Sequence, residues 1–127
     1  MADVNRGNRP LSPHLTIYRP QLTSITSILT RITGNALIVA TVLVIWWFFA
    51  ASTSEAYFNL VNAVLLSWFG QTILILSTWA LWYHLLAGIR HLIWDNALMM
   101  DIGTAERLGW VVIGGSVVLT VMTVLVV

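Results

Sequence analysis

The chain has 127 residues, of which 58% are hydrophobic and only 9% are charged, and its net charge is +1. A soluble domain carries about 25% charged residues, so the composition predicts a single unit that has lipid as its solvent. The absence of cysteine excludes disulfides and cysteine-ligated clusters on this chain. The six basic residues are all arginines and form no stripe that would bind nucleic acid.

Residues 1–21 are predicted to form an irregular arm at the membrane surface. Pro10, Pro13 and Pro20 interrupt any helix there. The arm has neither the apolar segment of a secretory signal nor the amphipathic pattern of a transit peptide. We therefore expect an N-terminus that inserts without cleavage, in a multi-pass protein of a bacterial inner membrane.

Three uncharged runs follow the arm, at residues 32–54, 56–89 and 108–127. One crossing of a bilayer needs about 20 apolar residues, because each residue of a helix rises about 1.5 Å. The middle run is too long for one crossing and too short for two, and Asn59 and Asn62 suggest a loop that extends to about Val64. We predict an all-α membrane protein, a single domain over residues 1–127, with three transmembrane helices at about 23–51, 65–92 and 109–127.

The placement of the arginines predicts the orientation of these helices. Arg6, Arg9, Arg19 and Arg31 lie in the arm or at the start of the first span, and Arg90 and Arg107 flank the loop after the second. The loop after the first span carries only Glu55. The positive-inside rule then places the N-terminus in the cytoplasm and the C-terminus on the outer side. Because three short spans leave little room for an independent core, we also expect a partner chain.

His84 is the first candidate functional residue, because an ionisable side chain inside a membrane helix is costly to hold there. It lies six residues before Arg90, so about 9 Å deeper along the helix axis. A metal would satisfy one ring nitrogen, and Gly88 at i+4 leaves room for a flat group such as haem. His91 is on the same helix and cannot be the opposite ligand of the same iron, so a bis-histidine haem would need a ligand from another chain. The alternative is a histidine that simply hydrogen-bonds a neighbouring helix.

Ser27 and Arg31 form a second constellation, at i and i+4 on the first predicted helix. A hydroxyl and a guanidinium on one face suit a quinone carbonyl, on which negative charge develops during reduction. Arg31 would also pair with a haem propionate, because His84 should lie at a similar depth. The alternative is an arginine that snorkels to the interface and a serine that caps a helix start.

Two segments of the chain resemble signatures of a known family. Arg9 to Leu15, followed by Ser27 to Gly34, is similar to the N-terminal signature of the succinate dehydrogenase cytochrome b556 subunits, and His84 to Ala97 is similar to their second signature. The resemblance covers the whole chain. It implies a membrane anchor of respiratory complex II that contacts a second small anchor subunit, an iron–sulfur subunit and a flavoprotein subunit in the lipid bilayer.

The resemblance also implies the roles of individual residues. His84 would be an axial ligand of haem b, with the opposite histidine supplied by the second anchor subunit. Ser27 and Arg31 would form part of the ubiquinone site, and His91 would at most contact a propionate or the surroundings of the ligand. Many members of the family carry histidine or arginine just before the quinone-site arginine, whereas this chain has Thr30, so no propionate contact is expected from that side chain.

Three alternatives remain open at the level of the sequence. The chain could be an anchor that keeps the fold without haem, or the anchor of a related quinol:fumarate reductase that runs in the opposite direction. A small transporter or channel subunit is the third, although the sequence shows no repeat and no pair of broken helices.

Overall fold

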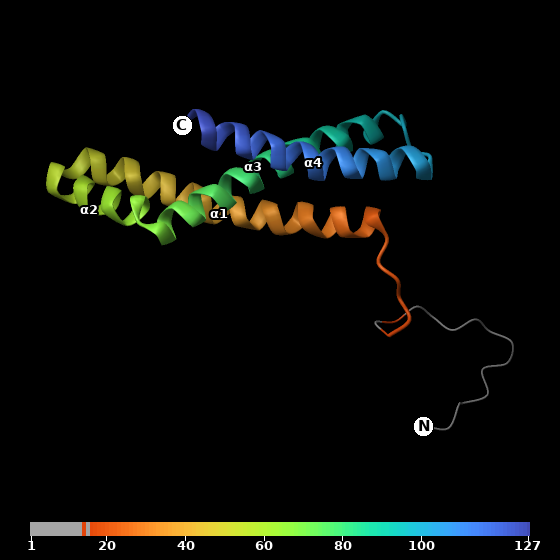
Figure 1. Cartoon of the computed structure of the whole chain (residues 1–127), viewed down its shortest axis with the longest axis horizontal. Helices are drawn as coiled ribbons and strands as arrows, with labels where there is room; N and C mark the ends of the chain where they lie inside the picture. The colour runs from red at the N-terminus through yellow and green to blue at the C-terminus, as the bar shows by residue number, and fades with distance from the viewer. Residues whose placement is uncertain (1–13, 15) are drawn as a thin grey trace, which may run out of the picture.

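The computed structural model describes residue 14 and residues 16–127, and the regular structure of these residues is entirely helical (Figure 1). The helices are α1 (Leu22–Thr53), α2 (Glu55–Leu66), α3 (Trp68–Asp95) and α4 (Ile102–Val126). Of these, α1, α3 and α4 are long and apolar enough to cross a membrane, which confirms the predicted all-α fold with three spans. Residues 1–13 and 15, which include most of the predicted surface arm and most of the segment from Arg9 to Leu15, lie outside the described residues.

Helix α2 occupies the segment where the sequence pattern indicated a loop. Ser54 caps its start by accepting a hydrogen bond from the backbone N–H of Tyr57 at 3.2 Å. The Trp46 indole N–H donates to the Tyr57 hydroxyl at 2.8 Å, so α2 is held beside the end of α1 (Figure 1). Asn59 and Asn62 are weak helix formers, but contacts with α1 and α3 outweigh that preference here.

The joint between α2 and α3 requires glycine at one position. The Ser67 hydroxyl caps α3 by accepting from the backbone N–H of Gly70 at 3.2 Å. A Cβ on Gly70 would collide with the carbonyl oxygens of Val64 and Leu65 at the end of α2. The close approach of these two backbones is what lets α3 begin only two residues after α2 ends.

Helix α3 packs against each of the other three helices. Its buried Tyr83 and Ala87 meet Val112 of α4, and these residues are joined by the partly buried Leu29, Trp79, Leu86 and Ile113. The Trp82 indole N–H donates across to the Thr123 hydroxyl of α4 at 2.9 Å. Packing and interhelical hydrogen bonds of this kind hold a bundle together in lipid, where the hydrophobic effect between helices is weak.

The start of α1, the end of α3 and the start of α4 lie together at one end of the bundle. A Cβ on Gly109 of α4 would lie 3.2 Å from the Leu22 side chain of α1 and 3.5 Å from Arg90 Nη1 of α3. Arg19, three residues before α1 begins, and Arg107, in the second turn of α4, also lie near this end. The outward faces of the spans are apolar and exposed in the chain by itself, as expected of surfaces that contact lipid or a partner.

Candidate functional site

The His84 side chain is half-buried on α3 and lies against α1. Its Nδ1 is 3.1 Å from the backbone carbonyl oxygen of Thr30 and 3.3 Å from the Thr33 hydroxyl. A carbonyl oxygen only accepts hydrogen bonds, so Nδ1 carries the proton in the neutral ring. The lone pair is therefore on Nε2. Metal-ligating histidines are held in this way, with one nitrogen donating to the protein and the other free to coordinate.

A glycine of α1 lies against this ring, and a second glycine lies one turn from His84 along α3. A Cβ on Gly34 of α1 would lie only 3.1 Å from His84 Cε1, so glycine lets the imidazole approach the α1 backbone. Gly88 lies one turn along α3 from His84, and a Cβ built there meets nothing within 4 Å among the described residues. The surface of α3 is therefore open at Gly88, one turn from the histidine. An unprotonated ring nitrogen and an open helix surface one turn away are compatible with a flat, metal-containing group such as haem.

A row of buried and half-buried hydroxyl groups runs along the face of α1 that contacts α3. The Thr30 and Thr33 hydroxyls donate to the carbonyls of Thr26 and Leu29, each at 2.8 Å. The buried Tyr83 hydroxyl of α3 donates to the Thr26 carbonyl at 3.0 Å. Of these residues, sequence reasoning named only Thr30, and for another reason, although hydroxyls recurring every three or four positions in an apolar helix were a visible signal of a polar face.

Arg90 lies inside the bundle and is only 2% exposed. Its Nη2 donates to the Thr26 hydroxyl at 3.1 Å, and its Cζ lies 4.7 Å from the centre of the Trp94 ring. Its Nε and Nη1 are buried without a hydrogen-bond partner among the described residues. The guanidinium thus turns inward to Thr26 and the Trp94 ring, whereas Asp95 one residue further along the chain is exposed.

Ser27 and Arg31 lie beside the residues that contact α3 but do not themselves bond to His84. Ser27 is half-buried and Arg31 is exposed. Arg31 directly follows Thr30, whose carbonyl oxygen accepts from His84, so Arg31 and His84 lie at the same level of the bundle, as predicted.

His91 is exposed and packs edge-on against Trp94, with ring centres 5.5 Å apart. The quinone roles of Ser27 and Arg31 and the haem role of His91 remain predictions.

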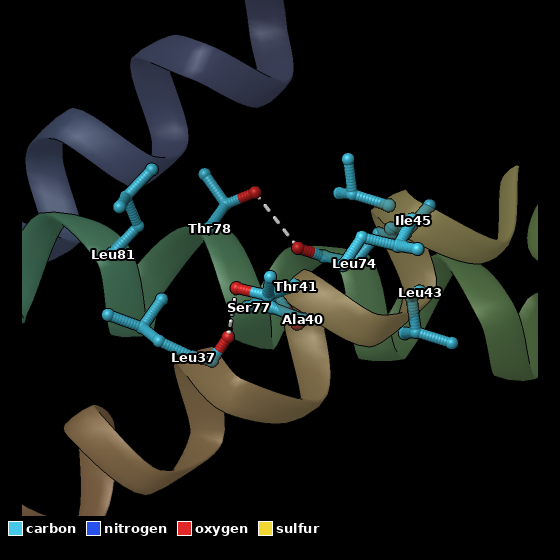
Figure 2. Close-up of a pocket in the computed structure, with 10 residues that line it drawn as sticks. Leu37, Ala40, Thr41, Leu43, Ile45, Leu74, Ser77, Thr78 and Leu81 are labelled. Carbon is cyan, nitrogen blue, oxygen red and sulfur yellow. Dashed lines mark hydrogen bonds between the residues drawn. The ribbon is translucent and has the colours of Figure 1, made fainter. Parts of the chain in front are cut away.

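A second open feature lies further along the same helix pair. It is a groove of about 360 Å³ between α1 and α3, and we call it the apolar groove (Figure 2). The Thr41 and Thr78 hydroxyls donate to the carbonyls of Leu37 and Leu74 on their own helices, which removes their donors from the groove. No ionisable side chain is among its lining residues, which are Leu37, Ala40, Thr41, Leu43, Val44, Ile45, Leu74, Ser77, Thr78 and Leu81.

The sequence of the chain matches known proteins of one family. Residues 5–123 match the family model described as succinate dehydrogenase/fumarate reductase transmembrane subunit. The chain is 56% identical to the succinate dehydrogenase cytochrome b556 subunit of Paracoccus denitrificans, over 99% of this chain and 97% of that protein. It is 43% identical to the subunit of the same name from Rickettsia bellii, over 90% and 89% of the two chains. It is 36% identical to the succinate dehydrogenase cytochrome b560 subunit of Marchantia polymorpha, over 80% and 78%.

Proposed function

Since this chain belongs to the family of the succinate dehydrogenase/fumarate reductase transmembrane subunit, we propose that it is the haem b-binding membrane anchor of a succinate:ubiquinone oxidoreductase. It is a multi-pass inner-membrane subunit that takes part in an enzyme complex without being catalytic alone. The observation that carries the proposal is the His84 ring, whose Nδ1 is bonded to the Thr30 carbonyl of α1 so that the lone pair is left on Nε2.

His84 would hold the haem through Nε2, while Thr30 and Thr33 fix the orientation of the ring. Haem b, when bound, supplies a one-electron redox couple. The opposite ligand would come from the second small anchor subunit. Neither other histidine of this chain suits that position, because His91 is exposed on the same helix and His14 is exposed before α1 begins. The exposed apolar faces of the spans leave surface for that subunit.

Ser27 and Arg31 would serve the ubiquinone site. Ser27 would donate a hydrogen bond to a quinone carbonyl, and Arg31 would stabilise the negative charge that develops on the quinone oxygens and order a proton-donating water. The exposure of Arg31 supports this role, because its guanidinium is accessible to a substrate or a partner surface. Electrons would arrive from the flavoprotein subunit, where succinate is oxidised, through the iron–sulfur subunit.

We further propose that the end of the bundle with the starts of α1 and α4 faces the cytoplasm. The described arginines Arg19, Arg31, Arg90 and Arg107 all lie toward that end, whereas Glu55 lies at the other. By the positive-inside rule this orientation is favoured. The iron–sulfur subunit would then bind on the side where Ser27 and Arg31 are closest to the membrane surface.

The test is a pair of histidine variants in the purified whole complex. His84→Leu should remove or alter the b-type band of the reduced-minus-oxidised absorption spectrum, because it removes the proposed ligand. The control, His91→Leu, should keep the band. An unchanged band in an assembled His84→Leu complex would refute the ligand assignment, and a wild-type complex without any b-type band would favour a haem-free anchor.

A further inference from the structure

We propose that Arg90 acts as a fixed, buried positive charge that raises the reduction potential of the haem held by His84. The inference rests on the proposed function, because it needs a haem at that site. It concerns Arg90, to which the resemblance assigned no role.

The charge on Arg90 is buried and lacks an acidic counter-charge among the described residues. Its hydrogen bond goes to the neutral hydroxyl of Thr26, and two of its nitrogens have no partner in that part of the chain. A guanidinium does not lose its proton under ordinary conditions. The indole of Trp94 provides a partial compensation through its ring face, but a ring carries no net charge and leaves the field of the guanidinium in place.

Burial determines how far this charge acts. An exposed charge is surrounded by water and screened by salt within about 8–10 Å, whereas a buried one is screened much less. Arg31 and Arg107 are exposed, so the field of each is weakened by water or by headgroups. Arg90, at 2% exposed, is the buried arginine of the described residues.

Arg90 is also held in a fixed position relative to His84. The two residues are six positions apart on α3, which places their backbones about 9 Å apart along the axis. Both are bonded to the same stretch of α1. Arg90 donates to the Thr26 hydroxyl, the Thr30 hydroxyl donates to the Thr26 carbonyl, and His84 bonds to the Thr30 carbonyl.

The sign of the effect follows from charge. Reduction adds one electron to the haem, so a nearby positive charge stabilises the reduced form. With an effective dielectric constant of about 20, a unit charge on the order of 10 Å away, the scale of the ~9 Å axial rise between Arg90 and His84, gives a shift of about tenfold in the ratio of reduced to oxidised haem. For a one-electron couple, a tenfold ratio corresponds to about 59 mV.

The experiment is a potentiometric titration of the haem band in the purified whole complex. Arg90→Met removes the charge and keeps much of the side-chain volume, and replacing a buried ion by an apolar residue is often neutral for stability. We expect its midpoint potential to fall by about 59 mV, the tenfold shift estimated above. Arg90→Lys keeps the charge and should stay close to the wild type. The matched control Arg107→Met removes an exposed charge at the same end and should leave the potential unchanged.

Each outcome decides the proposal. An unchanged potential in Arg90→Met, or an equal fall in Arg90→Lys, would show that the charge does not tune the haem. Should Arg90→Met fail to assemble, Arg90→Gln, which keeps a donor for Thr26, carries the same test. Failure of both neutral variants while Arg90→Lys assembles would make Arg90 a structural residue and overturn the proposal. A wild-type complex with no haem band would instead overturn the proposed function.

Discussion

The interface between α1 and α3 has two halves that differ in character. In the first, which contains His84, side chains bond from one helix to the other: His84 to Thr30, Tyr83 to Thr26 and Arg90 to Thr26. In the second, the apolar groove, the hydroxyls of Thr41 and Thr78 are bonded to their own helices and the lining is otherwise almost wholly apolar (Figure 2). Among the described residues, the buried side-chain atoms that lack a hydrogen-bond partner, Arg90 Nε and Nη1, lie in the first half.

This difference separates a candidate site from a gap that lipid can fill. Polar groups in a membrane interior cost free energy unless they are paired. The half that contains a buried arginine and a half-buried histidine is therefore the candidate for a functional site. A groove lined by methyl groups has no such cost and needs no specific ligand. The groove offers volume without ionisable groups, whereas the surroundings of His84 carry the polar groups from which a site can be built.

The largest expected effect comes from placing the same bulky side chain in each half of the interface and comparing the haem bands. Gly88→Phe places a ring where a Cβ meets nothing within 4 Å, and we expect the haem band to be lost from the assembled complex because the group can no longer reach His84. Ala40→Phe fills the apolar groove by the same side chain and should keep the band. Absorption spectra of the two purified complexes measure this, and a normal band in Gly88→Phe would place the haem elsewhere.

The next largest effect concerns Arg31. Arg31→Leu should lower ubiquinone reduction by about 100-fold, because one charged donor to the developing negative charge is lost. Reduction of an artificial dye by the flavoprotein and iron–sulfur subunits should survive, since it does not use the anchor. Parallel assays on one preparation test this. An equal loss of both activities would mean that the variant fails to assemble and that Arg31 is structural.

A smaller effect distinguishes hydrogen bonds between helices from those within one helix. Tyr83→Phe removes the donor to the Thr26 carbonyl across the interface and should destabilise the complex by about 1 kcal/mol. Thr78→Val removes a hydroxyl that bonds only to its own helix and should change stability by less than about 0.5 kcal/mol. Thermal unfolding of the detergent-solubilised complex compares them, and equal melting temperatures would show that the two halves do not differ energetically.

The sequence predicted the spans well and the site only in part. Long uncharged runs identify membrane helices because lipid leaves few alternatives, so α1, α3 and α4 followed directly. Helix α2 did not, because its amphipathic segment with Asn59 and Asn62 is stabilised by contacts such as Trp46 with Tyr57 that no local pattern reveals. The partners of His84 also depend on which residues of α1 face α3. For the same reason the inward turn of Arg90 could not be predicted from its place near the end of an apolar run.

The smallest predicted effect lies outside both halves, at the start of α4. The backbone N–H of Thr104 donates to the Asp101 carboxylate at 2.9 Å and holds the pKa of that carboxyl below its usual value. Because the pKa is lower in the folded chain, the ionised carboxylate stabilises the first turn above the unfolded pKa of about 3.9, and this contribution is lost as pH falls through the folded pKa. Amide hydrogen exchange of that turn, corrected for intrinsic rates, should show less protection at about pH 3 than at about pH 5. Asp101→Asn keeps an oxygen acceptor that does not titrate, so its protection should change less over the same interval. An identical loss in both proteins would show that the carboxylate is not the group responsible.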